Sequence, residues 1–340
     1  MPYYLTSNPP LEESYTKLPS NALLHQQSLN RDDTCTKEYE IPTINLHGLT
    51  SGISQERTKC KEDIAKAASE WGIFHVLDHG ISQKLLQVMR REQVRLFSMP
   101  FEKKRSWCGL PYGSYRWGTP TATCQEQFSW SEAFHVPLSD TGESCSSEEF
   151  KTFREVMDKL ATDMSNLANI IARALSEYLG EPSTRCITKS CSKSTSFFRL
   201  NHYPNCPISE ETFGLVPHTD SDFLTILHSD KVGKLQLKMK DSKWVSVQPK
   251  PGALIVNIGD LFQAWSNDVY KSVEHRVMPH HGVDRYSMVY FLCPSYDSPI
   301  GSCTGRAPIY RSFTFGEFRK EVDKDVKQLG CKVGLPRFLL

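Results

Sequence analysis

Three residues in the second half of the chain have the types and the spacing to bind a metal ion. His218 and Asp220 stand two positions apart in the segment LVPHTD, and residues i and i+2 of a strand point to the same face. His275 lies in KSVEHRVM, on a separate predicted strand that a β fold can bring back across the first. Two imidazoles and one carboxylate leave open coordination positions and suit an iron(II) centre that activates dioxygen. The three residues therefore predict a non-haem iron site.

Two further strands carry polar residues at the same alternating spacing. Arg285 and Ser287 share one face of RYSMVYFL, and a guanidinium fork with a neighbouring hydroxyl matches the far carboxylate of a dicarboxylate such as 2-oxoglutarate. In FFRLNHYP, alternation places Arg199, Asn201 and Tyr203 on one face, which a β-sandwich normally fills with aliphatic residues. We interpret this face as the wall of a polar pocket.

Each feature taken alone has a plainer interpretation. A single His-X-Asp is common, and a second copy occurs at 228–230, where the following Lys-Val-Gly indicates a turn between strands. The combination of His218, Asp220 and His275 with Arg285 and Ser287 is what favours a metal site. The run 103–105 is expected to be a solvated basic surface. The other histidines are expected to be surface or satisfied core residues, namely His75, His79, His135, His202, His280 and His281.

Composition excludes several classes of partner. The 340 residues include 40 Lys plus Arg and 39 Asp plus Glu, so net charge gives no reason to expect nucleic acid or an acidic membrane. The 11 cysteines form no Cys-X-X-Cys pair, which argues against disulfides and thiolate zinc and favours a reducing compartment. The amino terminus lacks the pattern of a signal peptide, and no apolar run is long enough to span a membrane. We expect a cytoplasmic protein, with the nucleus as a further location.

The pattern of elements changes along the chain. Residues 1–38 are polar and without periodicity, and we expect an arm that is partly disordered. Residues 39–185 read as a helical region, residues 194–300 as short β-rich runs separated by turn residues, and residues 301–340 as a helical extension. Many short strands in series favour a sandwich or a double-sheet jelly roll.

Within the helical region, two helices and one strand are predicted in detail. Apolar residues recur every three or four positions from 150 to 179, which predicts a long amphipathic helix ending at Gly180. Ser82 is a predicted N-cap for a helix that stops before Pro100. Residues 73–76, which precede both helices, predict a strand.

The chain resembles a known family, the plant iron(II), 2-oxoglutarate-dependent dioxygenases. The resemblance covers about residues 39–340 and includes HTD, SVEHRV, RYS, SEWGIFHVLDHGI, RLNHYPNCP, GDLFQAWSN and GLPRFL. It implies a mainly β fold with flanking helices, built on a distorted double-stranded β-helix with a helical amino-terminal half. It also implies that iron is held by His218, Asp220 and His275. By the same resemblance, 2-oxoglutarate is bound by Tyr203, Arg285 and Ser287, with Asn201 assisting.

A narrower resemblance concerns the substrate. The segment 112–138 is similar to the gibberellin 2-oxidases, and SWSEAFHVPL within it resembles the branch that acts on twenty-carbon gibberellins. This implies 2β-hydroxylation, an inactivating step, with Fe(II), 2-oxoglutarate and O2 as cofactors and ascorbate as reductant. Two alternatives stay open. One is another gibberellin oxidase or a flavonoid oxidase, and the other is a non-catalytic receptor on the same fold, for which a damaged ligand set is expected.

An apolar tetracyclic acid needs an aromatic cleft and a cation for its carboxylate. Trp130, Phe134, Phe291 and Tyr296 are candidate wall residues. Arg116 or Arg199 is a candidate partner of the carboxylate. For each, core packing or a surface ion pair is the alternative interpretation. The oligomeric state is left open by the sequence.

Overall fold

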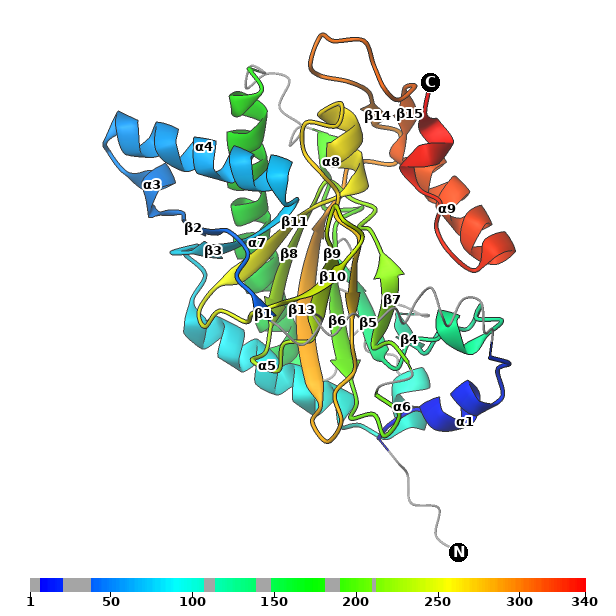
Figure 1. Ribbon diagram of the computed structural model, residues 1–340. Helices are drawn as coiled ribbons and strands as arrows, with labels where there is room; N and C mark the ends of the chain where they lie inside the picture. The colour runs from blue at the N-terminus through cyan, green and yellow to red at the C-terminus, as the bar shows by residue number, and fades with distance from the viewer. Residues whose placement is uncertain (1–6, 21–37, 107–113, 139–147, 181–189, 210–211) are drawn as a thin grey trace, which may run out of the picture.

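Two β-sheets packed face to face form the centre of the protein (Figure 1). The structure is a computed structural model that describes residues 7–20, 38–106, 114–138, 148–180, 190–209 and 212–340. The larger sheet has the strand order β2-β3-β11-β8-β13-β6-β5-β4, and the smaller sheet has the order β1-β10-β9-β12-β7. Strands β14 and β15 pair separately. This architecture confirms the predicted jelly roll with flanking helices.

The strands have the following bounds: β1 Glu38–Tyr39, β2 Thr43–Asn45, β3 Ile73–Leu77, β4 Tyr115–Trp117, β5 Glu132–Pro137, β6 Phe197–Tyr203, β7 Leu215–His218, β8 Leu224–Ser229, β9 Leu235–Lys238, β10 Trp244–Val247, β11 Leu254–Ile258, β12 His275–Val277, β13 Arg285–Leu292, β14 Pro299–Ile300 and β15 Phe313–Thr314. The helices are α1 Leu11–Thr16, α3 His47–Thr50, α4 Ser54–Glu70, α5 Gln83–Phe97, α6 Phe101–Arg105, α7 Lys151–Tyr178, α8 Asp260–Trp265 and α9 Phe315–Leu329, with 3-10 turns η2 Gln125–Gln127, η3 Glu148–Phe150 and η5 Leu335–Phe338.

The long helix α7 packs on the outer face of the larger sheet. It contacts β8 and β13 and the neighbouring helices α4 and α5 (Figure 1). Its buried side chains recur at helical spacing, and Leu160, Met164 and Ile171 join Met288 and Tyr290 of β13 in one core cluster. Because strand residues alternate between faces, the neighbours of Met288 and Tyr290 on β13 point inward, between the two sheets. The predicted span 150–179 is confirmed to within a residue.

The chain enters and leaves its helices with the expected capping chemistry. The Ser82 hydroxyl accepts a hydrogen bond from the Leu85 amide at the start of α5, as an N-cap does. Thr314 caps α9 in the same way, and Gly330 ends α9 with a φ of 75°, a conformation that favours glycine.

Among the described residues, no helix is long and apolar enough to cross a membrane.

Strands from both halves of the chain contribute to one sheet. In the first half, β4 and β5 extend the larger sheet next to β6, while β3 joins its other side next to β11. The segment before residue 39 contains α1, whose Leu11 and Tyr15 pack with Phe128 and Trp130. Residues 1–6 and 21–37 lie outside the described residues. The boundary expected near residue 190 therefore separates two stretches of the sequence, but strands from both stretches share one sheet and one core.

Candidate metal centre and cosubstrate pocket

The three predicted metal ligands lie together at one end of the smaller sheet. His218 ends β7, His275 begins β12, and the two residues are direct cross-strand partners. Their imidazole centroids are 4.3 Å apart. Asp220 Oδ1 lies 3.9 Å from His218 Nε2 and 3.8 Å from His275 Nε2. The side-chain ligand atoms thus converge on one point.

The backbone fixes which ring nitrogens face that point. Nδ1 of His218 is 2.9 Å from the carbonyl oxygen of Val216, and Nδ1 of His275 is 3.1 Å from that of Val273. When Nδ1 donates to a carbonyl, Nε2 is left as a lone-pair donor, as metal-binding histidines require. Burial and the neighbouring His275 hold the pKa of His218 well below its ordinary value. These residues fit a divalent iron ion.

Two polar side chains of the larger sheet orient the carboxylate of Asp220. Its Oδ2 accepts hydrogen bonds from Thr225 Oγ1 at 2.8 Å and from Asn257 Nδ2 at 3.1 Å, leaving Oδ1 toward the imidazoles. Thr225 also bonds Asp222, at 2.9 Å. Burial and the charge of Asp220 raise the pKa of Asp222. A protonated Asp222 can donate to the Thr225 hydroxyl, whose single hydrogen then goes to Asp220.

The predicted cosubstrate residues line a cavity of about 60 Å³, which we call the iron cavity and which the three predicted metal ligands also line. Arg285 is 2 % exposed and holds its place by donating from Nε to the Gly233 carbonyl at 2.6 Å and from Nη2 to Ser229 Oγ at 2.9 Å. Its Nη1 is buried without a hydrogen-bond partner among the described residues. A buried donor of this kind needs an acceptor, and a ligand carboxylate would supply one.

The pairing of β6 with β13 explains why the polar residues meet. Arg285 lies opposite Tyr203, and Ser287 lies opposite Asn201. The Asn201 amide donates to the Ser287 hydroxyl at 3.2 Å, and the guanidinium of Arg285 lies 4.9 Å from the centre of the Tyr203 ring. The two i, i+2 pairs that the sequence identified are therefore one patch on the inner face of the larger sheet.

Comparison with known proteins agrees with this geometry. Residues 194–294 match the model of the 2OG-Fe(II) oxygenase superfamily, and residues 41–156 match that of the non-haem dioxygenase in morphine synthesis N-terminal region. Gibberellin 2-beta-dioxygenase 8 of Arabidopsis thaliana is 48 % identical, covering 98 % of both chains. Gibberellin 2-beta-dioxygenase 6 of Oryza sativa subsp. japonica is 49 % identical over 97 % of this chain and 96 % of its own. This chain belongs to the gibberellin 2-beta-dioxygenase family.

Two solved structures have a similar fold, and one of them contains 2OG and Fe. The crystal structure of JOX2 in complex with 2OG, Fe and JA matches with a TM-score of 0.77 at 27 % identity, covering 98 % of this chain and 99 % of that one. The dioxygenase for auxin oxidation in rice matches with a TM-score of 0.72 at 28 % identity, covering 88 % and 100 %. Like its relatives, this gibberellin 2-beta-dioxygenase family member is a 2-oxoglutarate-dependent enzyme that uses Fe(II), and its substrate is a small molecule.

The four aromatic residues considered for the substrate wall lie in different surroundings. Phe291 lines the iron cavity and stacks on Phe197, with ring centroids 4.5 Å apart. Phe134 belongs to the core beneath the helices, and Trp130 packs near α1, so neither lines the cavity. Tyr296 is exposed and stacks on Phe315 of α9.

An imidazole next to Phe134 was not singled out by the sequence. His135 of β5 pairs with Arg199, which lines the iron cavity, and its ring centroid lies 4.1 Å from that of Phe197. Although His135 is exposed, partial desolvation by the surrounding protein and then the charges of Arg199, Arg319 and Arg116 lower its pKa to about 4. Both arginines considered for the substrate carboxylate therefore lie near His135, together with a third from α9. Only the register of β5 against β6 could have selected His135 over Phe134.

A buried charge network supports the cosubstrate strands from the outer face. Glu132 of β5 accepts hydrogen bonds from Lys104 Nζ at 2.6 Å and from the Tyr115 hydroxyl, and its Oε1 lies 2.7 Å from His202 Nδ1. His202 Nε2 lies 3.1 Å from Asp284. The expectation that the basic run 103–105 is entirely solvated was wrong for Lys104, which is 1 % exposed. Its partner, 28 positions away, lies on a strand that the sequence did not predict.

The network predicts a pH-dependent stability. Burial disfavours the charged form of His202, but hydrogen bonds to Asp284 and Glu132 outweigh it and raise the pKa above the ordinary 6.5. The stabilisation is therefore fully present below about pH 6.5 and is lost as the pH rises through the raised value. Urea unfolding of wild type and His202→Gln should show a larger difference in unfolding free energy at pH 6 than at pH 9. The exposed control His281→Gln should show little difference at either pH. If the effect of His202→Gln grew toward alkaline pH, the result would contradict the conclusion that the protonated imidazole of His202 stabilises the protein.

The hydrogen bonds that Asp220 accepts from Thr225 and Asn257 are expected to strengthen metal binding. Thr225→Val keeps the shape of the side chain and removes the hydroxyl bond to Asp220. Loss of such a bond typically weakens metal affinity about 10- to 100-fold, and we expect this range for Fe(II) measured anaerobically by competition with a chelator. Thr162→Val on the surface of α7 is the matched control. Unchanged Fe(II) affinity in Thr225→Val would show that this hydroxyl does not position the ligand.

Proposed function

We propose that this protein hydroxylates gibberellins at carbon 2 and that its preferred substrates are the twenty-carbon gibberellins. The names of the relatives support the reaction. The distribution of positive charge beside the iron cavity supports the substrate class. Ascorbate would keep the iron reduced, and free cysteines at the described positions, such as Cys60 and Cys293, favour a cytoplasmic location.

In this proposal the residues of the chain divide into two groups. His218, Asp220 and His275 hold Fe(II) on one side. Arg285 and Ser287 bind the far carboxylate of 2-oxoglutarate, with Tyr203 and Asn201 completing the wall. Bound iron supplies the redox chemistry, in which 2-oxoglutarate becomes succinate and carbon dioxide and one oxygen atom of O2 enters a carbon–hydrogen bond. The protein groups orient the reactants and exclude water.

The observation that carries the substrate class is a group of arginines that form no ion pair with the described residues. Arg116, Arg199 and Arg319 all lie close enough to His135 for their charges to act on it. Among the described residues, none of the three forms an ion pair, and Arg199 donates only to the amide oxygen of Asn201 at 2.9 Å. Arg116 is exposed, whereas Arg199 and Arg319 are partly buried, and a partly buried cation is stabilised by a counter-charge. An acidic substrate would supply it.

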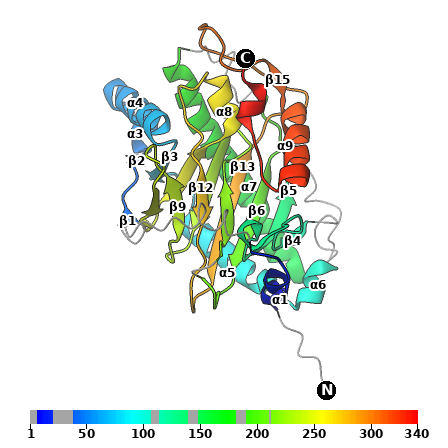
Figure 2. The same ribbon diagram turned by 45° about the vertical axis from the view of Figure 1, so that its right-hand side comes forward.

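Sheet register places Arg116 and Arg199 on the face that carries the cosubstrate residues. Arg116 lies opposite Ala133, Ala133 opposite Asn201, and Asn201 opposite Ser287. The small side chain of Ala133 leaves room above that row. Helix α9, which carries Arg319, lies next to β5 in Figure 2, in keeping with the effect of the Arg319 charge on His135 of β5. The stacked rings of Phe197 and Phe291 offer an apolar surface next to these cations.

The number of arginines favours a substrate with two carboxylates. A twenty-carbon gibberellin keeps two free carboxylates, whereas in a nineteen-carbon gibberellin one of them is closed into a lactone. Three unpaired guanidinium groups match the first better than the second, because Arg binds carboxylates in a bidentate manner. The apolar ring system would pack on the aromatic surface.

The proposal predicts a selective loss of affinity. Arg116→Gln and Arg319→Gln should each raise KM for a twenty-carbon diacid about 10- to 100-fold, since a charged hydrogen bond is worth about 1.5–3 kcal/mol. They should change KM for a nineteen-carbon lactone acid much less and leave kcat within a few-fold. Mass spectrometry of the product with one added oxygen measures both. Arg306→Gln, an exposed arginine elsewhere, is the control.

Two results would contradict the proposal. Equal increases in KM for both acids would contradict the proposal that these arginines bind the second carboxylate of the diacid. Succinate without any oxygenated gibberellin would leave the iron and 2-oxoglutarate site standing and overturn the substrate class.

A further inference from the structure

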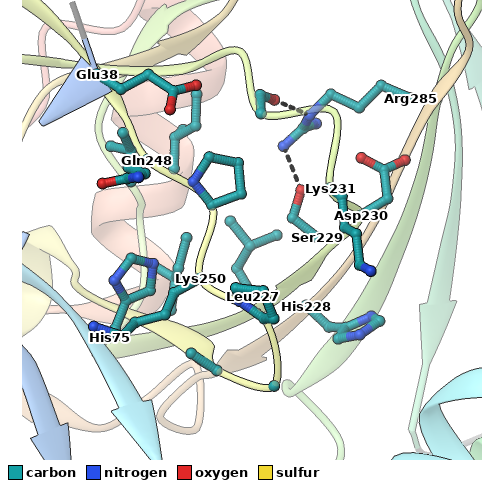
Figure 3. Close-up of a pocket in the computed structure, with 18 of the residues that line it drawn as sticks. Glu38, His75, Leu227, His228, Ser229, Asp230, Lys231, Gln248, Lys250 and Arg285 are labelled. Carbon is teal, nitrogen blue, oxygen red and sulfur yellow. Dashed lines mark hydrogen bonds between the residues drawn. The ribbon is translucent and has the colours of Figure 1, made fainter. Parts of the chain in front are cut away.

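A second cavity, which we call the rear cavity, lies behind Arg285 (Figure 3). Its volume is about 450 Å³. Leu227, Leu235 and Arg285 line both the rear cavity and the iron cavity, so these three side chains form the wall between them. Apart from Arg285, none of the residues assigned to iron or to 2-oxoglutarate lines the rear cavity.

His75 of β3 lies on the wall of this cavity at the far end of the sheet from His135. Cross-strand pairs run from His135 through Arg199, Val289, Leu227 and Ile255 to His75 along the inner face. The imidazole is 3 % exposed and has no hydrogen-bond partner among the described residues. Burial and the charge of Lys250 lower its pKa to about 4. The ring is neutral near pH 7, and one of its nitrogens can donate to an anion.

Two lysines lie at opposite sides of the cavity. Figure 3 shows Lys250 beside His75 and Lys231 on the other side of Leu227, toward Arg285. Lys250 donates to the Thr43 hydroxyl at 3.1 Å. Neither lysine forms an ion pair with any residue that the structure describes.

The carboxylates that face the cavity do not balance these charges. Asp230 Oδ2 accepts a hydrogen bond from the Tyr286 amide at 2.6 Å and lies 3.8 Å from Arg90 Nη2, and Oδ1 accepts one from the Val232 amide at 3.1 Å, so the charge of Asp230 is already opposed by Arg90. Glu38 is the other acidic residue on the wall, against the cations Arg90, Lys231, Lys250 and Arg285. Positive charge is therefore in excess, and it is concentrated at two separate places.

Between the two charged places the wall is apolar. Leu227, Leu235, Val247 and Ile255 are all buried and line the cavity. We propose that the rear cavity binds an organic diacid with an apolar middle, with one carboxylate at His75 and Lys250 and the other at Lys231. The cosubstrate 2-oxoglutarate, its product succinate and a gibberellin diacid all have this chemistry.

Occupancy would act on the iron cavity through Arg285. The two groups that hold this guanidinium, the Ser229 hydroxyl and the Gly233 carbonyl, also belong to the rear wall. A carboxylate next to Lys231 would attract the same guanidinium. Binding in the rear cavity therefore weakens the binding of 2-oxoglutarate at iron, because the two anions compete for one charge.

The test is a count of bound 2-oxoglutarate per chain. Equilibrium dialysis of the full-length protein with Fe(II) and without oxygen gives the total, while the visible absorbance of iron-bound 2-oxoglutarate gives the occupancy of the iron site. We expect two equivalents in wild type, of which one absorbs. Lys250→Met and His75→Phe should weaken the second, non-absorbing equivalent at least tenfold and keep the first. Lys84→Met, an exposed lysine on α5, is the matched control and should keep both.

Competition identifies the source of the diacid. Succinate or a twenty-carbon gibberellin that displaces the second equivalent, while the absorbance persists, is the better ligand, and if neither does so the ligand is 2-oxoglutarate itself. A single equivalent in wild type would overturn the proposal. So would a second equivalent that binds Lys250→Met as tightly as wild type, a result that does not depend on whether His75→Phe folds.

Discussion

The cross-strand pairing of His218 with His275 is the contact on which the active site depends. Both imidazoles face the same point because β7 and β12 are antiparallel neighbours at this position and because each Nδ1 is tied to a carbonyl two residues earlier. A slip of either strand by one residue would turn its side chain to the opposite face. The register of the smaller sheet therefore decides whether a metal site exists.

The two sheets contribute different parts of the site, and their packing joins them. The smaller sheet supplies the histidines, while the larger sheet supplies Thr225 and Asn257, which orient Asp220, and the strand that carries Arg285. Sheets pack about 10 Å apart, so side chains from both meet in the middle. Buried apolar residues between the sheets, such as Leu237 and Val277, hold this spacing. The hydrophobic core thus determines the geometry of the polar site.

The sequence could predict the face of each strand but not which residue lies opposite which. Alternation alone brought Arg285 together with Ser287, and Asn201 with Tyr203, and the long periodic helix was equally plain. The partners across strands came only with the structure. Phe134 and His135 are adjacent in sequence, and the register of β5 against β6 sends His135 to the Arg199 side. Lys104 was read as solvated because its partner Glu132 lies on a strand without a local signal.

One measurement tests the central claim most directly, namely that an inner face rich in unpaired arginines selects a diacid for hydroxylation at the iron. Equal amounts of a twenty-carbon and a nineteen-carbon gibberellin are mixed with the enzyme, Fe(II), 2-oxoglutarate and air, and the products are quantified by mass spectrometry at low conversion. The account predicts at least tenfold more oxygenated diacid than oxygenated lactone, since one additional charged contact is worth about 1.5–3 kcal/mol. Equal amounts, or an excess of the lactone product, would contradict it.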